Sequence, residues 1–401
     1  MSQQYIKIGL LATLLGPFKV MGEEGVRGAT LALAEFGHEV GGVPVELVVE
    51  GTNAVPQTAV DSAYLLFARK NIDFLVGPLS GNEGLAIRDY AKTVPDRVFI
   101  NGTAASQDIT LRNPADNFFS FSMHGVQWMA GLGTYAYGKL GYRRVVTIGE
   151  DYSYPHAQVA GFMLEFCRAG GEIINKVWLP LGTTDFRPFL LALEGEIDAI
   201  FVALAGRDAV NFLEQYAELG GNIPLIAGPS AVDTTVLGRK EDFPEHIIGV
   251  ASAGSTAAGN PAPEWQKFVQ AYRTEFPDGM AWPSATGYGY YVNMKAALLA
   301  LQAVDCDLSN GQAKFKQALR SLEFETPTGL VKVDHNRQAI ANNYVSVVDA
   351  DEEGRLYTRL VEEIPCVNQT LGIPEDQYLA LGPITAHNPT CEQIRALDNA
   401  V

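Results

Sequence analysis

The chain has 401 residues, of which 47% are hydrophobic and 19% charged, and 46 acidic against 29 basic residues give a formal charge of −17 at pH 7. This length favours two domains, and the composition is that of an ordinary soluble globular protein. The negative charge disfavours nucleic acid and anionic membrane surfaces as partners, because the long-range field repels them. No apolar run is long enough to span a membrane, so direct insertion is not expected.

Strands and helices are predicted to alternate through the first 120 residues. Apolar runs typical of strands occupy 6–14, 45–51, 73–80 and 98–102, and segments of helical length separate them. In the segment after the second run, the helical spacing predicts a buried face that contains Val60, Ala63, Tyr64 and Phe67.

The stretch 143–206 shows the same rhythm most clearly, as strand, helix, strand, helix and strand in one run. Its first helix carries an apolar stripe formed by Val159, Phe162, Met163 and Phe166. Two such halves predict an α/β protein with two doubly wound lobes and mainly parallel sheets. In sheets of this kind, ligands bind in the loops after the carboxyl ends of the strands.

Motifs for catalysis are missing from the sequence. The glycines at 22, 25 and 28 do not have the spacing of a dinucleotide-binding loop, and neither a nucleophile elbow nor a phosphate-binding loop occurs. The six histidines are scattered and form no metal-ligand pattern. We therefore expect no enzyme activity, no cofactor and no metal.

The four cysteines leave one question open. Cys167 lies beside an apolar helical stripe and is expected to be a small buried hydrophobe. Cys366 and Cys391 bracket a proline-rich tail, where a disulfide would restrict an otherwise loose segment, but spacing does not establish the pairing. The tail from Pro365 onward has little periodicity, so it either packs along one lobe or stays partly mobile.

Three loops at the ends of predicted strands, 14–18, 77–82 and 101–106, are rich in small and hydroxyl residues. Backbone N–H groups at helix starts can hold a carboxylate without a formal cation. The alternative for any single residue is a turn or a helix cap. Three such loops at one sheet edge favour a pocket.

Several segments together resemble the periplasmic solute-binding proteins of the leucine/isoleucine/valine type, the capture components of ABC importers. They are IKIGLLATLLGPFKVMGEEGVRGATLALAEF, VGPLSG, GEDYSY, GTTDF and PSATGYGYYVNMKAALLAL. The resemblance covers the chain to about residue 360. It implies a type I fold of two lobes that three crossovers join and that hinge shut on a ligand.

The resemblance also implies domain boundaries and partners. The first lobe should contain 1–123 and 255–332, and the second should contain 124–254 and 333–401. The partners are a small ligand and a membrane permease, and the protein is expected to be a monomer. A periplasmic location is expected with the signal peptide removed, since none precedes the first strand here.

Departures from the family pattern bear on the ligand. Relatives that bind amino acids carry acidic side chains about where Gly125 and Ser230 stand, and neither residue is acidic. A buried ammonium group would lack its charged partner, which disfavours a standard α-amino acid. Gly81 and Ala105 stand where relatives often have hydroxyl residues, but backbone amides at Gly81, Ala104 and Ala105 can still bind an acid.

The resemblance and the loops give a set of candidate ligand-binding residues. They are Phe18, Met21, Ser80, Gly81, Asn82, Asn101, Thr103, Ala104, Ala105, Ser106, His124, Tyr154, Arg207, Ser230 and Tyr288. Tyr154 matches a ligand-contacting aromatic residue of the family. Arg207 is either a cationic contact for the ligand or a surface residue that pairs with Asp208, and His124 is either a pocket donor or a hinge residue.

Three functions are compatible with these observations. The first is capture of a small organic acid, with an aromatic carboxylate as one possibility, for an ABC importer; a variant of it is binding of a branched-chain or other amino acid. The second is a cytoplasmic ligand sensor of the amide type on the same fold. The third is an enzyme, but the sequence contains no catalytic motif that supports it.

Overall fold

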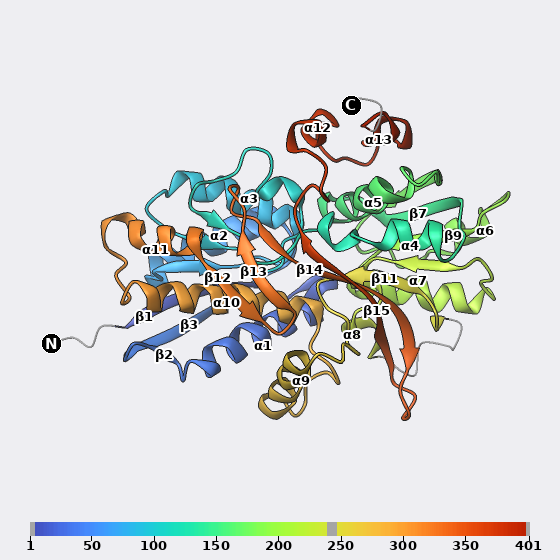
Figure 1. Ribbon diagram of the computed structural model, residues 1–401. Helices are drawn as coiled ribbons and strands as arrows, with labels where there is room; N and C mark the ends of the chain where they lie inside the picture. The colour runs from blue at the N-terminus through green and yellow to red at the C-terminus, as the bar shows by residue number, and fades with distance from the viewer. Residues whose placement is uncertain (1–4, 239–246, 398–401) are drawn as a thin grey trace. The chain divides into compact units, whose positions relative to one another are not determined.

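The computed structural model describes residues 5–238 and 247–397, which form two compact units of α/β architecture (Figure 1). Unit 1 consists of Met1–His124, Pro263–Gly279 and Thr286–Ala341. Unit 2 consists of Gly125–Ala262, Met280–Ala285 and Asn342–Val401. Within the described residues, no helix combines the length and the apolar character that crossing a membrane requires.

The main sheet of unit 1 has the strand order β2-β3-β1-β4-β5-β6. All neighbouring pairs are parallel except β2 and β3, which form an antiparallel hairpin. The strands are β1 (Ile6–Thr13), β2 (Glu39–Val40), β3 (Val43–Thr52), β4 (Phe74–Val76), β5 (Phe99–Ile100) and β6 (Phe118–Phe119). The parallel order brings the carboxyl ends of β1, β3, β4 and β5 to one edge.

The helices of unit 1 come from the N-terminal part of the chain and from two later segments that belong to the same unit. They are α1 (Lys19–Glu35), α2 (Pro56–Lys70), α3 (Gly81–Thr93), α9 (Pro263–Glu275), α10 (Ala285–Ala303) and α11 (Ser309–Ser321). The predicted face of α2 is wrong at Tyr64, whose exposed fraction is 58%. Ala59, Ala63 and Leu66 form the buried face, which lies further around the helix and packs with Leu75 of β4.

Unit 2 contains a mixed sheet with the order β14-β11-β10-β9-β7-β8, and β15 pairs with β14. Its strands are β7 (Arg144–Glu150), β8 (Glu172–Leu179), β9 (Ala199–Ala203), β10 (Leu225–Ala227), β11 (Ala251–Gly254), β14 (Ala339–Ala350) and β15 (Leu356–Val367). The strands from β8 to β11 are parallel, and β14 is antiparallel to β11. The first residues of β14 lie in unit 1, where they pair with β13 (Gly329–Val333), itself paired with β12 (Glu323–Thr326).

The longer helices of unit 2 are α5 (Ser153–Phe166) and α7 (Gly206–Glu218). The shorter ones are α4 (Leu132–Gly138), α6 (Arg187–Leu191), α8 (Thr234–Leu237), α12 (Glu375–Ala380) and α13 (Cys391–Ala396). The predicted apolar stripe of α5 is fully buried, and Phe162 stacks on Phe201 of β9 with ring centroids 4.7 Å apart. The α/β fold with mainly parallel sheets is therefore confirmed.

Two short segments lie in unit 2, although the predicted boundaries give them to the first lobe. In 255–262, the backbone N–H of Ala258 donates to Thr358 Oγ1 of β15 at 3.0 Å. In 280–285, Trp282 stacks on Tyr357 with ring centroids 5.5 Å apart. These contacts with β15 join both segments to unit 2.

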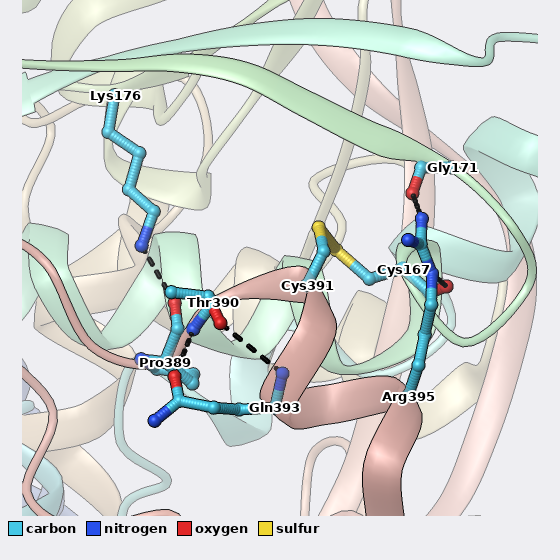
Figure 2. The surroundings of a disulfide bond; sticks show 8 residues. All are labelled: Cys167, Gly171, Lys176, Pro389, Thr390, Cys391, Gln393 and Arg395. Atoms are coloured by element: carbon cyan, nitrogen blue, oxygen red, sulfur yellow. Dashed lines mark hydrogen bonds between the residues drawn. A yellow bond between two sulfur atoms is a disulfide. The ribbon is translucent and has the colours of Figure 1, made fainter.

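The tail after β15 folds onto unit 2 through a disulfide between Cys167 and Cys391 (Figure 2). Arg395 donates to the carbonyl oxygens of Cys167 and Gly171, and Lys176 of β8 donates to that of Pro389. The considered pairing of Cys366 with Cys391 is thus wrong, and Cys167 is buried as a bridged residue rather than a lone hydrophobe. Cys366 is exposed and Cys306 buried, and both are free thiols.

Candidate functional site

In unit 1, the loop after β4 leads directly into α3 through a capping box. Ser80 Oγ accepts from the N–H of Glu83, and Glu83 Oε2 accepts from the N–H of Ser80, each at 3.4 Å. Thr13, at the end of β1, donates to Glu83 Oε2 at 3.2 Å. Burial raises the pKa of the Glu83 carboxyl, and hydrogen bonds to it act in the opposite direction. The first helical residue after this cap is Gly81, whose N–H group has no acceptor inside the helix.

The loop after β5 lies against the loop after β4. The N–H of Thr103 donates to the carbonyl of Pro78 at 3.1 Å, and that of Gly77 donates to the carbonyl of Ile100 at 2.9 Å. The Asn101 side chain accepts from the N–H of Ala104 at 3.1 Å and donates to its carbonyl at 2.9 Å. The structure thus brings these two predicted loops together.

These bonds change the roles of two predicted residues. Asn101 braces its own loop, and the Ala104 amide already has an acceptor within the protein. Ala105 and Ser106 follow in the same buried turn, with exposed fractions of 2% and 5%. Gly81 and Ala105 are the remaining backbone candidates for an acid.

The other predicted residues of unit 1 are buried in different places. Phe18 and Met21 lie directly after β1, with exposed fractions of 1% and 7%. His124 is buried, and desolvation lowers its pKa to about 3, so the ring is neutral at pH 7. Tyr288 packs edge-on to Trp265, and its hydroxyl lies 2.8 Å from Thr326 Oγ1, so its contacts are with α9 and β12 rather than with the strand-end loops.

In unit 2, the structure brings together Tyr154 of α5 and Ser230, which follows β10. The Tyr154 hydroxyl and Ser230 Oγ are 2.6 Å apart, and both residues are buried. The Trp128 ring packs edge-on to that of Tyr154 with centroids 5.6 Å apart. Burial raises the pKa of Tyr154, so its hydroxyl stays protonated.

Unit 2 contains two buried carboxyl groups: Glu150 is the last residue of β7, and Asp208 lies in the first turn of α7. Glu150 Oε1 accepts from the N–H of Ala205 at 2.8 Å, and Asp208 Oδ2 accepts from the N–H of Gly182 at 2.7 Å. Burial raises the pKa of Asp208 to about 6. Burial and the nearby Asp208 raise the pKa of Glu150 well above its usual value.

Arg207 is the second residue of α7 and is exposed. The alternative pairing with Asp208 is absent from the described residues, because that carboxylate turns toward Gly182. Arg207 therefore keeps its guanidinium in solvent beside the first turn of the helix.

Sequence reasoning did not single out Trp128 or Glu150 as site residues. A signal for Glu150 exists, because an acidic residue ends a buried apolar strand. Trp128 carries no such signal, since its contact with Tyr154 joins segments that α4 and β7 separate. No cluster of three or more metal-ligating side chains occurs in the part of the chain that the structure describes.

Comparisons with known proteins give one consistent result. The profile of the family described as "Periplasmic binding protein" matches residues 5–355. A curated relative, "Leu/Ile/Val-binding protein homolog 6" of Brucella melitensis, is 26% identical over 368 residues, which are 89% of this chain and 91% of that protein.

Solved structures agree with the sequence matches. An ABC transporter substrate-binding protein from Sphaerobacter thermophilus has a TM-score of 0.83 at 32% identity, and the match covers 91% of this chain and 99% of that one. A solute-binding protein of an ABC transporter from Rhodopseudomonas palustris BisB5, in complex with 3,4-dihydroxybenzoic acid, has a TM-score of 0.83 at 25% identity, with 91% and 98% covered. The resemblance inferred from the sequence motifs is confirmed.

Proposed function

The chain belongs to the periplasmic binding protein family, and from that premise we propose that it captures a small organic acid with an aromatic body for an ABC importer. The family consists of substrate-binding proteins of transporters, which bind small ligands and work with a permease.

The observation that carries the proposal is the surroundings of Ser230. Where amino-acid-binding relatives were expected to place an acid, this chain has a hydroxyl that is bonded to Tyr154, and Gly125 has no side chain. Asp233, the nearest acidic residue along the chain, accepts from the N–H of Ala285 at 2.8 Å and from the N–H of Thr235 at 2.9 Å. An ammonium group would therefore find no carboxylate at the two positions from which amino-acid-binding relatives were expected to supply one, and a missing charged partner costs about 1.5–3 kcal/mol.

Unit 1 supplies the complementary half of the proposal. The first turn of α3 and the loop after β5 present backbone N–H groups and small residues, which suit a carboxylate. The formal charge of −17 gives no long-range attraction for an acid, so short-range donors must provide the binding. Tyr154 and Trp128 of unit 2 suit an aromatic body. We propose each set as a ligand-binding surface of its own unit.

A branched-chain amino acid is the second candidate, because curated relatives are named Leu/Ile/Val-binding protein homologues. Titration calorimetry with benzoate, 4-hydroxybenzoate, leucine and a sugar separates the candidates. We expect an aromatic acid to bind and leucine to bind weakly or not at all. Submicromolar affinity for leucine, or binding of the sugar alone, would overturn the proposal.

The disulfide supports an extracytoplasmic location, which is that of the family. Disulfides persist in oxidising compartments and are rare in the cytosol, so the bond between Cys167 and Cys391 argues against a cytoplasmic sensor. Mass spectrometry of the protein taken from its native host, alkylated before reduction, tests this. Alkylation of both cysteines in the native protein would contradict it.

A further inference from the structure

Trp128 carries a buried donor that the protein itself does not use. Its exposed fraction is 6%, and its indole N–H has no hydrogen-bond partner among the residues that the structure describes. Trp178 of the same unit shows the usual arrangement, because its indole N–H donates to the carbonyl of Ala386 at 2.9 Å. A buried donor without an acceptor costs free energy, so the exception at Trp128 requires an explanation.

The position of Trp128 points to a ligand. Its ring packs on Tyr154 at an interplanar angle of 83°, and Tyr154 is hydrogen-bonded to Ser230. One of these two hydroxyls donates its proton to the other. The proton of the accepting hydroxyl remains available for a further acceptor. One group of contacting side chains thus offers an indole N–H and a hydroxyl proton.

The charges around this group decide what kind of acceptor fits. Glu150 and Asp233 lie close enough to Tyr154 to oppose its ionisation. Both acids are buried, with exposed fractions of 1% and 9%. A ligand carboxylate placed here would lie in a desolvated region beside Asp233, whose carboxyl oxygens already accept from the N–H groups of Thr235 and Ala285, and placing two acids together there is unfavourable. A neutral oxygen, such as a phenolic hydroxyl or a carbonyl, meets no such opposition.

Resting on the proposed function, we infer that Trp128 is a specificity-determining residue of the ligand site. Its Nε1–H donates to an uncharged oxygen that the aromatic acid carries on the side away from its carboxylate. The neutral oxygen of the ligand then belongs to unit 2. Ligands with a ring oxygen are preferred over the bare aromatic acid.

The test is a calorimetric comparison of benzoate with 4-hydroxybenzoate in the native protein and in Trp128→Phe, which keeps an aromatic ring and removes the donor. In the native protein we expect 4-hydroxybenzoate to bind roughly tenfold more tightly than benzoate. In Trp128→Phe that ratio should fall to about one, mainly through weaker binding of the hydroxylated acid.

Trp178→Phe is the matched control, because it removes an indole N–H that has a partner inside the protein. It should lower the melting temperature of the ligand-free protein and leave the ratio of the two affinities unchanged. Trp128→Phe should lower that melting temperature less. A preference that survives in Trp128→Phe overturns the inference while leaving the proposed function intact, whereas failure of both acids to bind the native protein overturns the proposed function itself.

Discussion

In unit 1 the loops after β4 and β5 present small residues and backbone N–H groups, whereas in unit 2 the segments at the ends of β7 and β10 present Tyr154, Ser230 and buried acids. Hydrogen bonds within the loops stabilise the first set: Ser80 caps α3, and the Asn101 side chain accepts from the N–H of Ala104. The second set is braced by a bond between two side chains, Tyr154 and Ser230. The same parallel-sheet geometry thus supports two different chemistries, one suited to an anion and one to a neutral aromatic body.

The two units also differ in their covalent cross-links. Unit 2 contains the disulfide that the described residues show, and it holds the tail against α5 and β8. The stability of unit 1 depends on the packing of its sheet and helices. Each prediction below tests one side of this comparison.

The largest effect is expected from removal of the disulfide by Cys391→Ser. The bond closes a loop of 224 residues, and loop-closure entropy corresponds to about 5 kcal/mol of stability. Urea unfolding should show a loss of that order, and amide exchange should accelerate first in α5, β8 and the tail. Cys366→Ser, which changes an exposed free thiol, should leave the free energy of unfolding unchanged. Equal stabilities of the two variants would show that the bridge contributes nothing.

The next effect concerns Asp208, whose pKa is raised to about 6 by burial. A carboxyl whose pKa is raised in the folded state keeps its proton to a higher pH there than in the unfolded chain. Its contribution to the free energy of unfolding therefore falls as pH rises from about 4 to about 6. Asp208→Asn removes this loss. The stability of the variant relative to the native protein should rise by up to about 3 kcal/mol between pH 4 and pH 7.

Urea unfolding at a series of pH values measures this difference. Asp185→Asn is the control in the same unit, because Asp185 is an exposed side chain paired with Arg187. Parallel stability curves for the native protein and Asp208→Asn would contradict the assignment of a buried, proton-retaining acid to unit 2.

A smaller effect tests the anion-binding character of unit 1. Ser80→Asp keeps a good helix cap but places a negative charge beside the amides proposed to hold the acid. We expect the fold to stay intact and the affinity for an aromatic acid to fall by on the order of 2 kcal/mol. Ser80→Asn, a neutral cap of similar size, serves as the control in the same calorimetric titration. Equal affinities in the two variants would place the carboxylate elsewhere.

The smallest effect is expected for Arg207→Ala. A buried guanidinium that contacts the acid would be worth on the order of 2–5 kcal/mol. Because Arg207 is exposed, we expect a loss of affinity below about 1 kcal/mol that disappears at high salt. Titrations at low and high salt check this, with Arg187→Ala as the control. A large loss that persists at high salt would show that Arg207 contacts the carboxylate directly.

What could be predicted from the sequence depended on local patterns. The stripe of α5 was correct because four apolar residues at helical spacing faced one sheet. The predicted buried face of α2 was wrong at Tyr64. The helix packs closest to the core on the side of the small residues Ala59 and Ala63, and a prediction based on hydrophobicity gives such small side chains little weight.

The parts that could not be predicted depend on contacts between distant residues. Cys167 and Cys391 are 224 positions apart, and the pairing requires the tail to return past β15 to the end of α5. The internal use of the Ala104 amide and the unused donor of Trp128 are properties of hydrogen-bond geometry, which no spacing in the sequence encodes.

The bridge from Cys167 to Cys391 makes more than half of the polypeptide a covalent ring, and this ring includes the segments Pro263–Gly279 and Thr286–Ala341 of unit 1. A single peptide-bond cut anywhere inside the ring opens it without releasing a fragment. A nicked molecule would therefore migrate as one intact chain in a denaturing gel and separate into two pieces only after reduction.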